Sequence, residues 1–206
     1  GNKIYLNNKP YYQRLVLDQG FYPDGIWTAP SDEALKHDIE MSKAAGFNGA
    51  RLHQKVFEER FHYWADKLGY IVWGEMASWD KDFNSVAAAR NFLSEWGNIV
   101  MRDRNHPALI VWTPFNEEFG VPSNEAGRFL TDVYNETRRL DPTRPVNTVS
   151  GGIYVISDFC TAHCYEQDGA RLHSMLFDGE KFYQPQGPNG GFDRAIRKLY
   201  YDGSLP

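Results

Sequence analysis

The sequence lacks the features that mark several large classes of protein. It has no apolar run of about 18 residues, so no transmembrane helix is predicted. Its lysines and arginines form no block, and the 206-residue chain has a net charge of −5, which gives no support for nucleic-acid binding. No G-x-G-x-x-G motif or P-loop follows an apolar run, which weakens the nucleotide-binding folds. We therefore expect neither a membrane nor a nucleic acid as a partner.

Cysteine is scarce as well, since Cys160 and Cys164 are the only two. They do not indicate a disulfide framework. With His163 they form a compact cluster, but zinc needs a fourth ligand, or three ligands and a water, in tetrahedral array, and no second cysteine pair exists. Glu59 and His62 make a single Glu-x-x-His motif, whereas carboxylate di-iron sites need two such pairs. We expect no metal and no other cofactor.

The remaining composition is that of an ordinary globular protein. Hydrophobic residues make up 42% of the chain and charged residues 24%, and the length suffices for one domain with a full core. Aromatic residues reach 15%, so some are expected to line a binding cleft while most pack in the core. The first residues, Gly1 to Tyr5, do not look like a signal peptide, and nothing indicates the compartment.

Apolar runs and helical stripes alternate along the chain. A hairpin over 4–12 comes first, and glycine- and proline-rich loops are expected up to residue 30 and over 177–191. The predicted strands are 15–17, which reads as buried, 47–52, 70–73, 109–112, 146–149 and 158–162. The predicted helices lie between Ser31 and Gly46 and over 57–68, 92–100, 129–140 and 192–201.

This alternation indicates βαβ units and a parallel sheet, either an open doubly wound sheet or a (β/α)₈ barrel. Barrel active sites collect at the carboxyl ends of the strands. Polar residues stand at those ends in this sequence: Asp18, Arg51, Glu75, Asn116, Glu117 and His163. A full barrel takes about 250 residues. We therefore predict an incomplete (β/α)₈ TIM barrel, about six of eight β/α units, forming one domain over 1–206 that ends on the lead into a seventh strand.

The strongest local signal runs from Trp112 to Glu117, where a predicted buried strand ends directly in a carboxylic acid. Partial burial raises the pKa of a carboxyl group, as a general acid at neutral pH requires. Asn116 could hydrogen-bond a ligand hydroxyl. Taken alone, however, an Asn-Glu pair is more often a turn or a helix start with a solvated glutamate, so the wider context decides.

That context is a series of longer motifs in order along the chain. They are Gly-Phe-Asn-Gly-Ala-Arg-Leu-His at 46–53, Asp-Lys-Leu-Gly-Tyr-Ile-Val-Trp-Gly-Glu at 66–75, Arg-Asp-Arg-Asn-His-Pro-Ala-Leu-Ile-Val-Trp at 102–112, and Asp-Pro-Thr-Arg-Pro-Val at 141–146. Together they resemble the second to fifth strands of the catalytic barrel of glycoside hydrolase family 2, the β-galactosidase and β-glucuronidase type. The resemblance covers most of residues 1–165.

The resemblance implies a retaining β-glycosidase in which Glu117 is the general acid/base and Asn116 its sugar-binding neighbour. Arg51 matches an arginine at the end of strand two that supports the catalytic carboxylates. Glu75 matches a carboxylate that ends strand three, where it is either structural or substrate-binding.

Other positions are less closely matched. His163 and Tyr165 fall where the family places polar or aromatic residues after strand six, so they are candidates for substrate binding or core packing. Asp18 is a further substrate-binding candidate, and both Asp18 and Trp79 are placed on rim loops. Many family members follow the strand-two arginine with a Ser-His pair, whereas this chain has Leu-His-Gln at 52–54, which leaves the role of its histidine open.

A retaining glycosidase also needs a carboxylate nucleophile about 5–5.5 Å from the acid/base. The resemblance places it as a glutamate at the end of strand seven, beyond Pro206. Glu118 should point away from its neighbour Glu117, and Glu75 and Asp18 have no family match to this role. We therefore expect a fragment of an enzyme that hydrolyses β-linked glycosides, with galactosides or glucuronides as substrates, and no turnover by the isolated chain.

Two other hypotheses remain open. Without its nucleophile, the chain could be a non-catalytic sugar-binding module. An open α/β protein that binds a phosphorylated ligand is the weaker alternative, because a glycine-rich loop is missing. An incomplete barrel would also expose unpaired strand edges and apolar surface, so we expect self-association or a locally disordered C-terminal segment.

Overall fold

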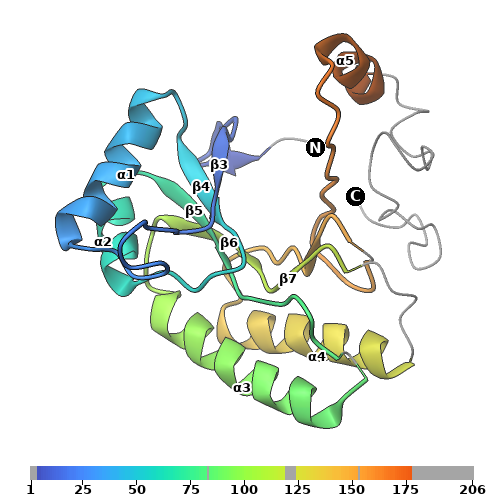
Figure 1. The fold of residues 1–206 in the computed structure, drawn as a ribbon. Helices are drawn as coiled ribbons and strands as arrows, with labels where there is room; N and C mark the ends of the chain where they lie inside the picture. The colour runs from blue at the N-terminus through green and yellow to red at the C-terminus, as the bar shows by residue number, and fades with distance from the viewer. Residues whose placement is uncertain (1–3, 83, 119–123, 153, 178–206) are drawn as a thin grey trace.

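A computed structural model describes residues 4–82, 84–118, 124–152 and 154–177 (Figure 1). Its centre is a parallel sheet in the order β3-β4-β5-β6, formed by Leu15–Asp18, Gly49–Leu52, Ile71–Glu75 and Leu109–Thr113. β7 (Phe115–Asn116) pairs in parallel with β8 (Val149–Ser150). A short hairpin of β1 (Tyr5–Leu6) and β2 (Lys9–Pro10) precedes the sheet, as predicted.

β6 and β7 act as one barrel strand that Pro114 interrupts, because proline has no N–H to donate to a ladder. The fifth strand region runs alongside both pieces. Trp112 forms a parallel bridge with Val146, and the Phe115 N–H donates to the Thr148 carbonyl at 3.1 Å. The described residues therefore contain five consecutive parallel barrel strands, with their carboxyl ends at one edge.

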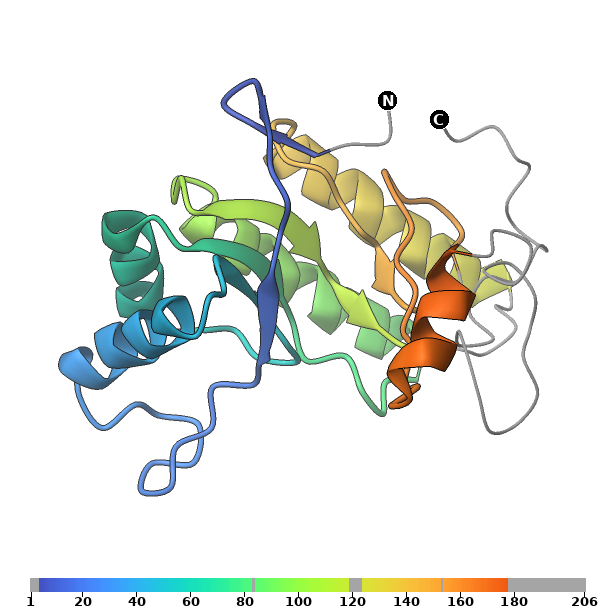
Figure 2. The same ribbon diagram turned by 90° about the horizontal axis from the view of Figure 1, so that it is seen from above.

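The helices are α1 (Asp32–Ala44), α2 (Glu59–Leu68), α3 (Val86–Asp103), α4 (Asn124–Leu140) and α5 (Gly169–Phe177). α1 packs beside α2 and α3 beside α4, along the outside of the sheet (Figures 1 and 2). Typical caps start α1 and end α2. The Ser31 hydroxyl accepts the Ala34 N–H at 3.2 Å, and α2 stops at Gly69, whose φ of 62° is left-handed.

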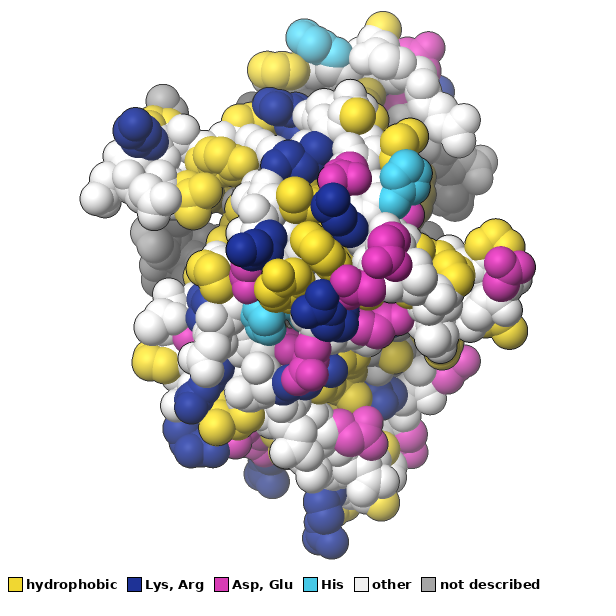
Figure 3. Space-filling model, turned by 90° about the vertical axis from the view of Figure 1, so that its left-hand side faces the viewer, with side chains coloured by type: hydrophobic (Ala, Val, Ile, Leu, Met, Phe, Trp, Pro, Cys, Tyr) yellow, Lys and Arg dark blue, Asp and Glu magenta, His cyan; other side chains and the backbone are white. Residues whose placement is uncertain are grey.

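The outer face over α1 and α2 is a mixed surface (Figure 3). Acidic, basic and hydrophobic side chains are interspersed on it, and ion pairs such as Lys36–Glu40 and Arg60–Asp32 join some of the charges. None of the helices in the described ranges is long and apolar enough to cross a membrane.

An aromatic core fixes the strand that leads to the site. Phe92 of α3 stacks on Phe115 of β7 at 4.6 Å between ring centroids, and Trp96 meets Trp112 edge-on at 5.5 Å. All four are buried. The indole N–H of Trp112 donates to Asp141 at 2.8 Å, so the strand is held by packing and by a buried hydrogen bond.

One strand prediction is wrong, and a second is right in position but wrong in burial. The segment 158–162 is not a strand, because side-chain hydrogen bonds take the place of a ladder: the Asn147 amide donates to the Phe159 carbonyl at 3.0 Å, and the Thr161 N–H donates to the Tyr154 hydroxyl at 2.7 Å. The strand at 15–17 exists but is not fully buried, since it is an edge strand in which Leu17 is 56% exposed.

The last part of the chain also differs from the expectation. The sequence patterns did not predict α5, whose start is capped by the Asp168 carboxylate accepting the Arg171 N–H at 2.8 Å. The predicted helix 192–201 and nearly all of the predicted loop 177–191 lie outside the described residues.

Candidate active site

A cavity of about 420 Å³ opens at the carboxyl ends of the strands. It brings together five of the predicted site residues: Arg51, Asn116, Glu117, His163 and Tyr165. Its other lining residues are Leu17, Gln19, His53, Trp79 and Cys164. Two predicted residues, Asp18 and Glu75, do not line it.

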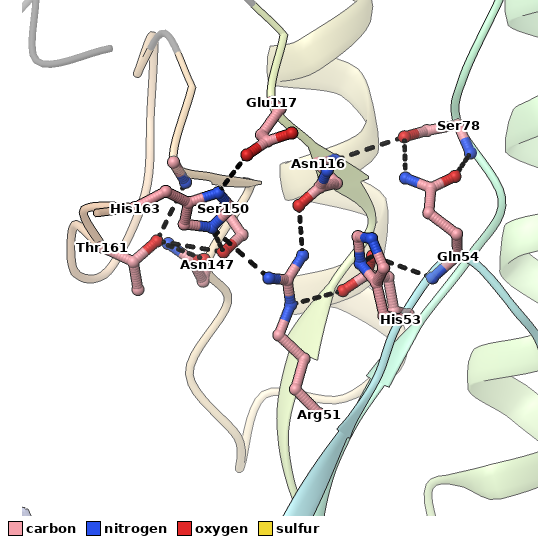
Figure 4. A network of polar contacts seen from close by, with 12 residues as sticks. Arg51, His53, Gln54, Ser78, Asn116, Glu117, Asn147, Ser150, Thr161 and His163 are labelled. Atoms are coloured by element: carbon pink, nitrogen blue, oxygen red, sulfur yellow. Dashed lines mark hydrogen bonds and ion pairs between the residues drawn. The ribbon is translucent and has the colours of Figure 1, made fainter. Parts of the chain in front are cut away.

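Arg51 and Glu75 form the buried base of the site, and Figure 4 shows the Arg51 guanidinium pointing toward Asn116. The Arg51 guanidinium donates from Nε to Glu75 Oε2 at 2.7 Å and from Nη2 to Asn116 Oδ1 at 2.5 Å. Glu75 Oε1 also lies 3.0 Å from His53 Nδ1 and accepts the Gln54 N–H at 3.0 Å. A buried carboxylate needs such partners, so Glu75 positions Arg51 and His53 instead of touching a ligand. Of its two predicted roles, the geometry supports the structural one.

Asn116 lines the cavity, and its amide nitrogen is buried. The residue is buried, its N–H donates to the Ser78 hydroxyl at 3.2 Å, and its Oδ1 is occupied by Arg51. Within the described part of the chain, its amide nitrogen Nδ2 makes no hydrogen bond of good geometry, although the Asn116 side chain helps to lower the pKa of Glu117. A buried donor without a partner costs about 1–3 kcal/mol. Asn116 can therefore recover this cost by donating to a ligand oxygen.

Glu117 occupies a strained backbone position at the end of β7, with a φ of 52°. A non-glycine residue rarely adopts this left-handed conformation, which costs about 1–2 kcal/mol. The position is held by a 2.9 Å hydrogen bond from the Glu117 N–H to the Ser150 carbonyl. Strain of this kind at a cavity wall is typical of functional sites.

Two donors converge on one oxygen of Glu117. His163 Nδ1 lies 2.5 Å from Oε1, and the Tyr165 hydroxyl donates to the same atom. Burial raises the pKa of Glu117, but the hydrogen bonds from Tyr165 and His163 outweigh it and leave the pKa below its usual value. The predicted rise in pKa is therefore wrong for this arrangement, in which Glu117 is held as a carboxylate.

The surroundings of His163 define which nitrogen carries its proton. Nε2 lies 3.4 Å from Arg51 Nη1 and 3.0 Å from the Ser150 hydroxyl. Since a guanidinium can only donate, Nε2 is the acceptor and Nδ1 carries the hydrogen that is donated to Glu117. Beneath the ring lies Gly151, with a φ of 66°, where a Cβ would come within 2.4 Å of the imidazole. The ring therefore needs a glycine at this position.

Asp18 faces away from the cavity. Successive side chains of a strand point to opposite faces, so Leu17 and Gln19 line the cavity while Asp18 does not. Its carboxylate accepts the Gly20 N–H at 2.8 Å, and burial raises its pKa. The structure thus does not bring Asp18 to the site.

The sequence did not assign a role to three residues that shape the cavity. His53 lines it directly. Gln54 and Ser78 lie outside the lining and hydrogen-bond to each other. The departure at Leu-His-Gln from the family's pattern marked this place without showing its geometry. For metals, the described residues contain no group of three or more His, Cys, Asp or Glu side chains that could hold an ion.

The chain is similar in sequence and fold to several known proteins. Residues 2–185 match the family model for glycosyl hydrolases family 2, TIM barrel domain. The β-galactosidase of Vibrio vulnificus (strain YJ016) is 26% identical over 183 residues, 85% of this chain and 17% of that protein. The β-glucuronidase of Rattus norvegicus is 29% identical over 161 residues, 74% of this chain and 24% of the rat protein. The chain thus spans less than a quarter of either relative.

Solved structures show the same fold. A β-glucuronidase from Ruminococcus gnavus in complex with N1-substituted uronic isofagomine has a TM-score of 0.67 at 22% identity, over 77% of this chain and 28% of that one. The β-glucuronidase of Parabacteroides merdae has a TM-score of 0.63 at 23% identity, over 69% of this chain and 19% of that one.

Proposed function

Because this chain belongs to glycoside hydrolase family 2, we propose that the protein is a retaining β-glycosidase with Glu117 as its general acid/base. The family match confirms the predicted family and TIM-barrel fold class. The observation that carries the proposed role is the place of Glu117 at the carboxyl end of a barrel strand, in one cavity with Arg51 and Asn116. The named relatives favour a β-galactoside or a β-glucuronide as substrate.

The site residues divide the work between binding and proton transfer. Asn116 Nδ2 donates to a ring hydroxyl of the bound sugar, a contact that strengthens as the oxocarbenium-like transition state forms. Glu117 protonates the leaving oxygen in the first step and removes a proton from water in the second. Tyr165 and His163 stabilise the carboxylate form, which is the one that the second step requires.

The nucleophile is proposed to lie outside the described residues. Glu117 is the one carboxylate of the described residues that lines the cavity, and Glu75 is tied to Arg51 and His53. We place the nucleophile on a glutamate at the end of the barrel's seventh strand. The same observation favours a second candidate for the chain by itself, a sugar-binding module without turnover.

The test is Glu117→Gln in the full-length protein, assayed on β-galactosides and β-glucuronides. Loss of a general acid costs about 10²–10⁴ in rate when the leaving group is poor, so an alkyl or disaccharide substrate should slow by that factor. Aryl glycosides with good leaving groups need little protonation and should keep their rate of glycosyl-enzyme formation. Glu118→Gln is the matched control, because Glu118 is the next residue and does not line the cavity. Equal losses on both substrate types would contradict the acid role.

A further inference from the structure

The cavity has a buried polar floor and an exposed aromatic rim. Arg51, His53 and Asn116 on the floor are all at most 9% exposed, whereas Trp79 is 62% and Tyr165 72% exposed. A sugar that uses the floor's donors lies deep in the cavity. The group attached to that sugar then extends outward to the rim, where Tyr165 is engaged with Glu117 through its hydroxyl.

Trp79 is exposed but firmly anchored. Gln54 bridges the loops after β4 and β5, since its Oε1 accepts the N–H groups of Ser78 at 2.7 Å and Trp79 at 3.3 Å while its Nε2 donates to the Ser78 hydroxyl at 3.1 Å. Ser78 is fully buried and also accepts the Asn116 N–H. The Trp79 ring meets His53 edge-on at 6.2 Å with an interplanar angle of 82°. The Trp79 backbone is thus hydrogen-bonded to Gln54, and Gln54 is bonded to Ser78, which also accepts from the Asn116 backbone.

A fixed, exposed indole at a cavity mouth is a platform for a ring with an apolar face. The strand before it, β5, pairs with β6, the strand that leads directly to Glu117. We propose that Trp79 forms the leaving-group subsite, on which the sugar or aryl ring displaced from a bound β-glycoside stacks. This subsite rests on the proposed glycosidase function, because the leaving group is defined by the bond that Glu117 protonates.

The test compares two substrates of the full-length protein that share one glycosyl group, a β-linked disaccharide and the glycosyl fluoride of the same sugar. Fluoride has no ring to stack. Trp79→Ala should lower kcat/KM for the disaccharide about tenfold and leave the fluoride within about twofold. Trp27→Ala is the matched control, because Trp27 is 64% exposed and outside the cavity, and it should change neither value.

Equal losses on both substrates, or no loss on either, would overturn the subsite. If the unmodified protein hydrolyses neither substrate for any β-sugar tested, the proposed function fails and the subsite fails with it. Hydrolysis with an unchanged disaccharide-to-fluoride ratio in Trp79→Ala contradicts the subsite alone.

Discussion

The two ends of the strands carry similar residues arranged in opposite ways. At the carboxyl ends, Arg51, Asn116 and Glu117 line a cavity, and Glu75, outside the lining, accepts from Arg51. At the amino ends, Asp141 accepts from the Trp112 indole, the Thr143 N–H and hydroxyl, and Arg144. These hydrogen bonds connect α4 and the following loop to β6. Burial raises the pKa of Asp141, but the hydrogen bonds outweigh this effect and lower the pKa to about 2. The charged groups around Asp141 are thus occupied by one another, whereas those at the carboxyl ends surround a cavity.

A histidine cluster also lies at the amino ends, and within the described residues its buried His62 Nδ1 has no hydrogen-bond partner. His106 Nδ1 lies 2.6 Å from Asp66, whose other oxygen accepts the Ala108 N–H at 2.8 Å. His62 stacks on His106 at 5.2 Å and lies 3.5 Å from Asp103. Most of the motif at 102–112 therefore stabilises the position of β6, and only its continuation to Glu117 reaches the cavity. Strand ends on this side of a barrel serve stability, and those on the other side serve chemistry.

The largest effect that separates the two ends is a pH effect on stability. Burial lowers the pKa of His62 to about 4, against about 6.5 in an unfolded chain. The free energy of unfolding that depends on a neutral His62 ring is fully present above pH 6.5. It decreases as the pH falls towards 4, by at most about 3 kcal/mol. His62→Gln, which cannot titrate, should remove this pH dependence, measured as hydrogen exchange of the α2 amides in the full-length protein.

At neutral pH, His62→Gln should leave kcat/KM unchanged per folded molecule, because the residue does not line the cavity. An unaltered pH dependence of exchange in the variant would show that another group controls the acid stability of α2.

The next effect compares two left-handed glycines with nearly the same backbone angle. Gly69 ends α2 at a φ of 62° and a Cβ there would meet no atom within 4 Å, whereas at Gly151 it would meet the His163 ring. Alanine should cost about 1–2 kcal/mol of backbone strain at each position. Only Gly151→Ala should also lower kcat/KM, by about tenfold, because it displaces the donor to Glu117. Similar activity in the two variants would contradict the role of His163 in positioning Glu117.

The smallest effect concerns Tyr165. Tyr165→Phe removes a donor that stabilises the Glu117 carboxylate, so the pKa of Glu117 should rise. Glu117 must be protonated in the first step, so the basic limb of the kcat/KM profile should move to higher pH. A limb that stays in place or moves to lower pH would show that Glu117 does not set it.

The sequence predicted the elements around the site well, because they depend on local patterns. Ser31 and Gly46 enclosed the helix that became α1, and polar residues after apolar runs marked the cavity edge. The direction of the Glu117 pKa was wrong for a non-local reason: the donors that decide it lie 46 and 48 residues further along the chain. The prediction that Asp18 belongs to the site was wrong for a local reason, because a shift of one residue along a strand turns a side chain to the other face.

The central claim, that Glu117 is the acid/base of a retaining glycosidase, is tested most directly by chemical rescue. The full-length Glu117→Ala variant is given an activated β-glycoside and azide, and the configuration of the glycosyl azide product is determined by NMR. Removal of an acid/base lets azide attack the glycosyl-enzyme from the side of residue 117, so the account predicts the β-azide. An α-azide would identify Glu117 as the nucleophile, and the absence of any rescued product would contradict its catalytic role.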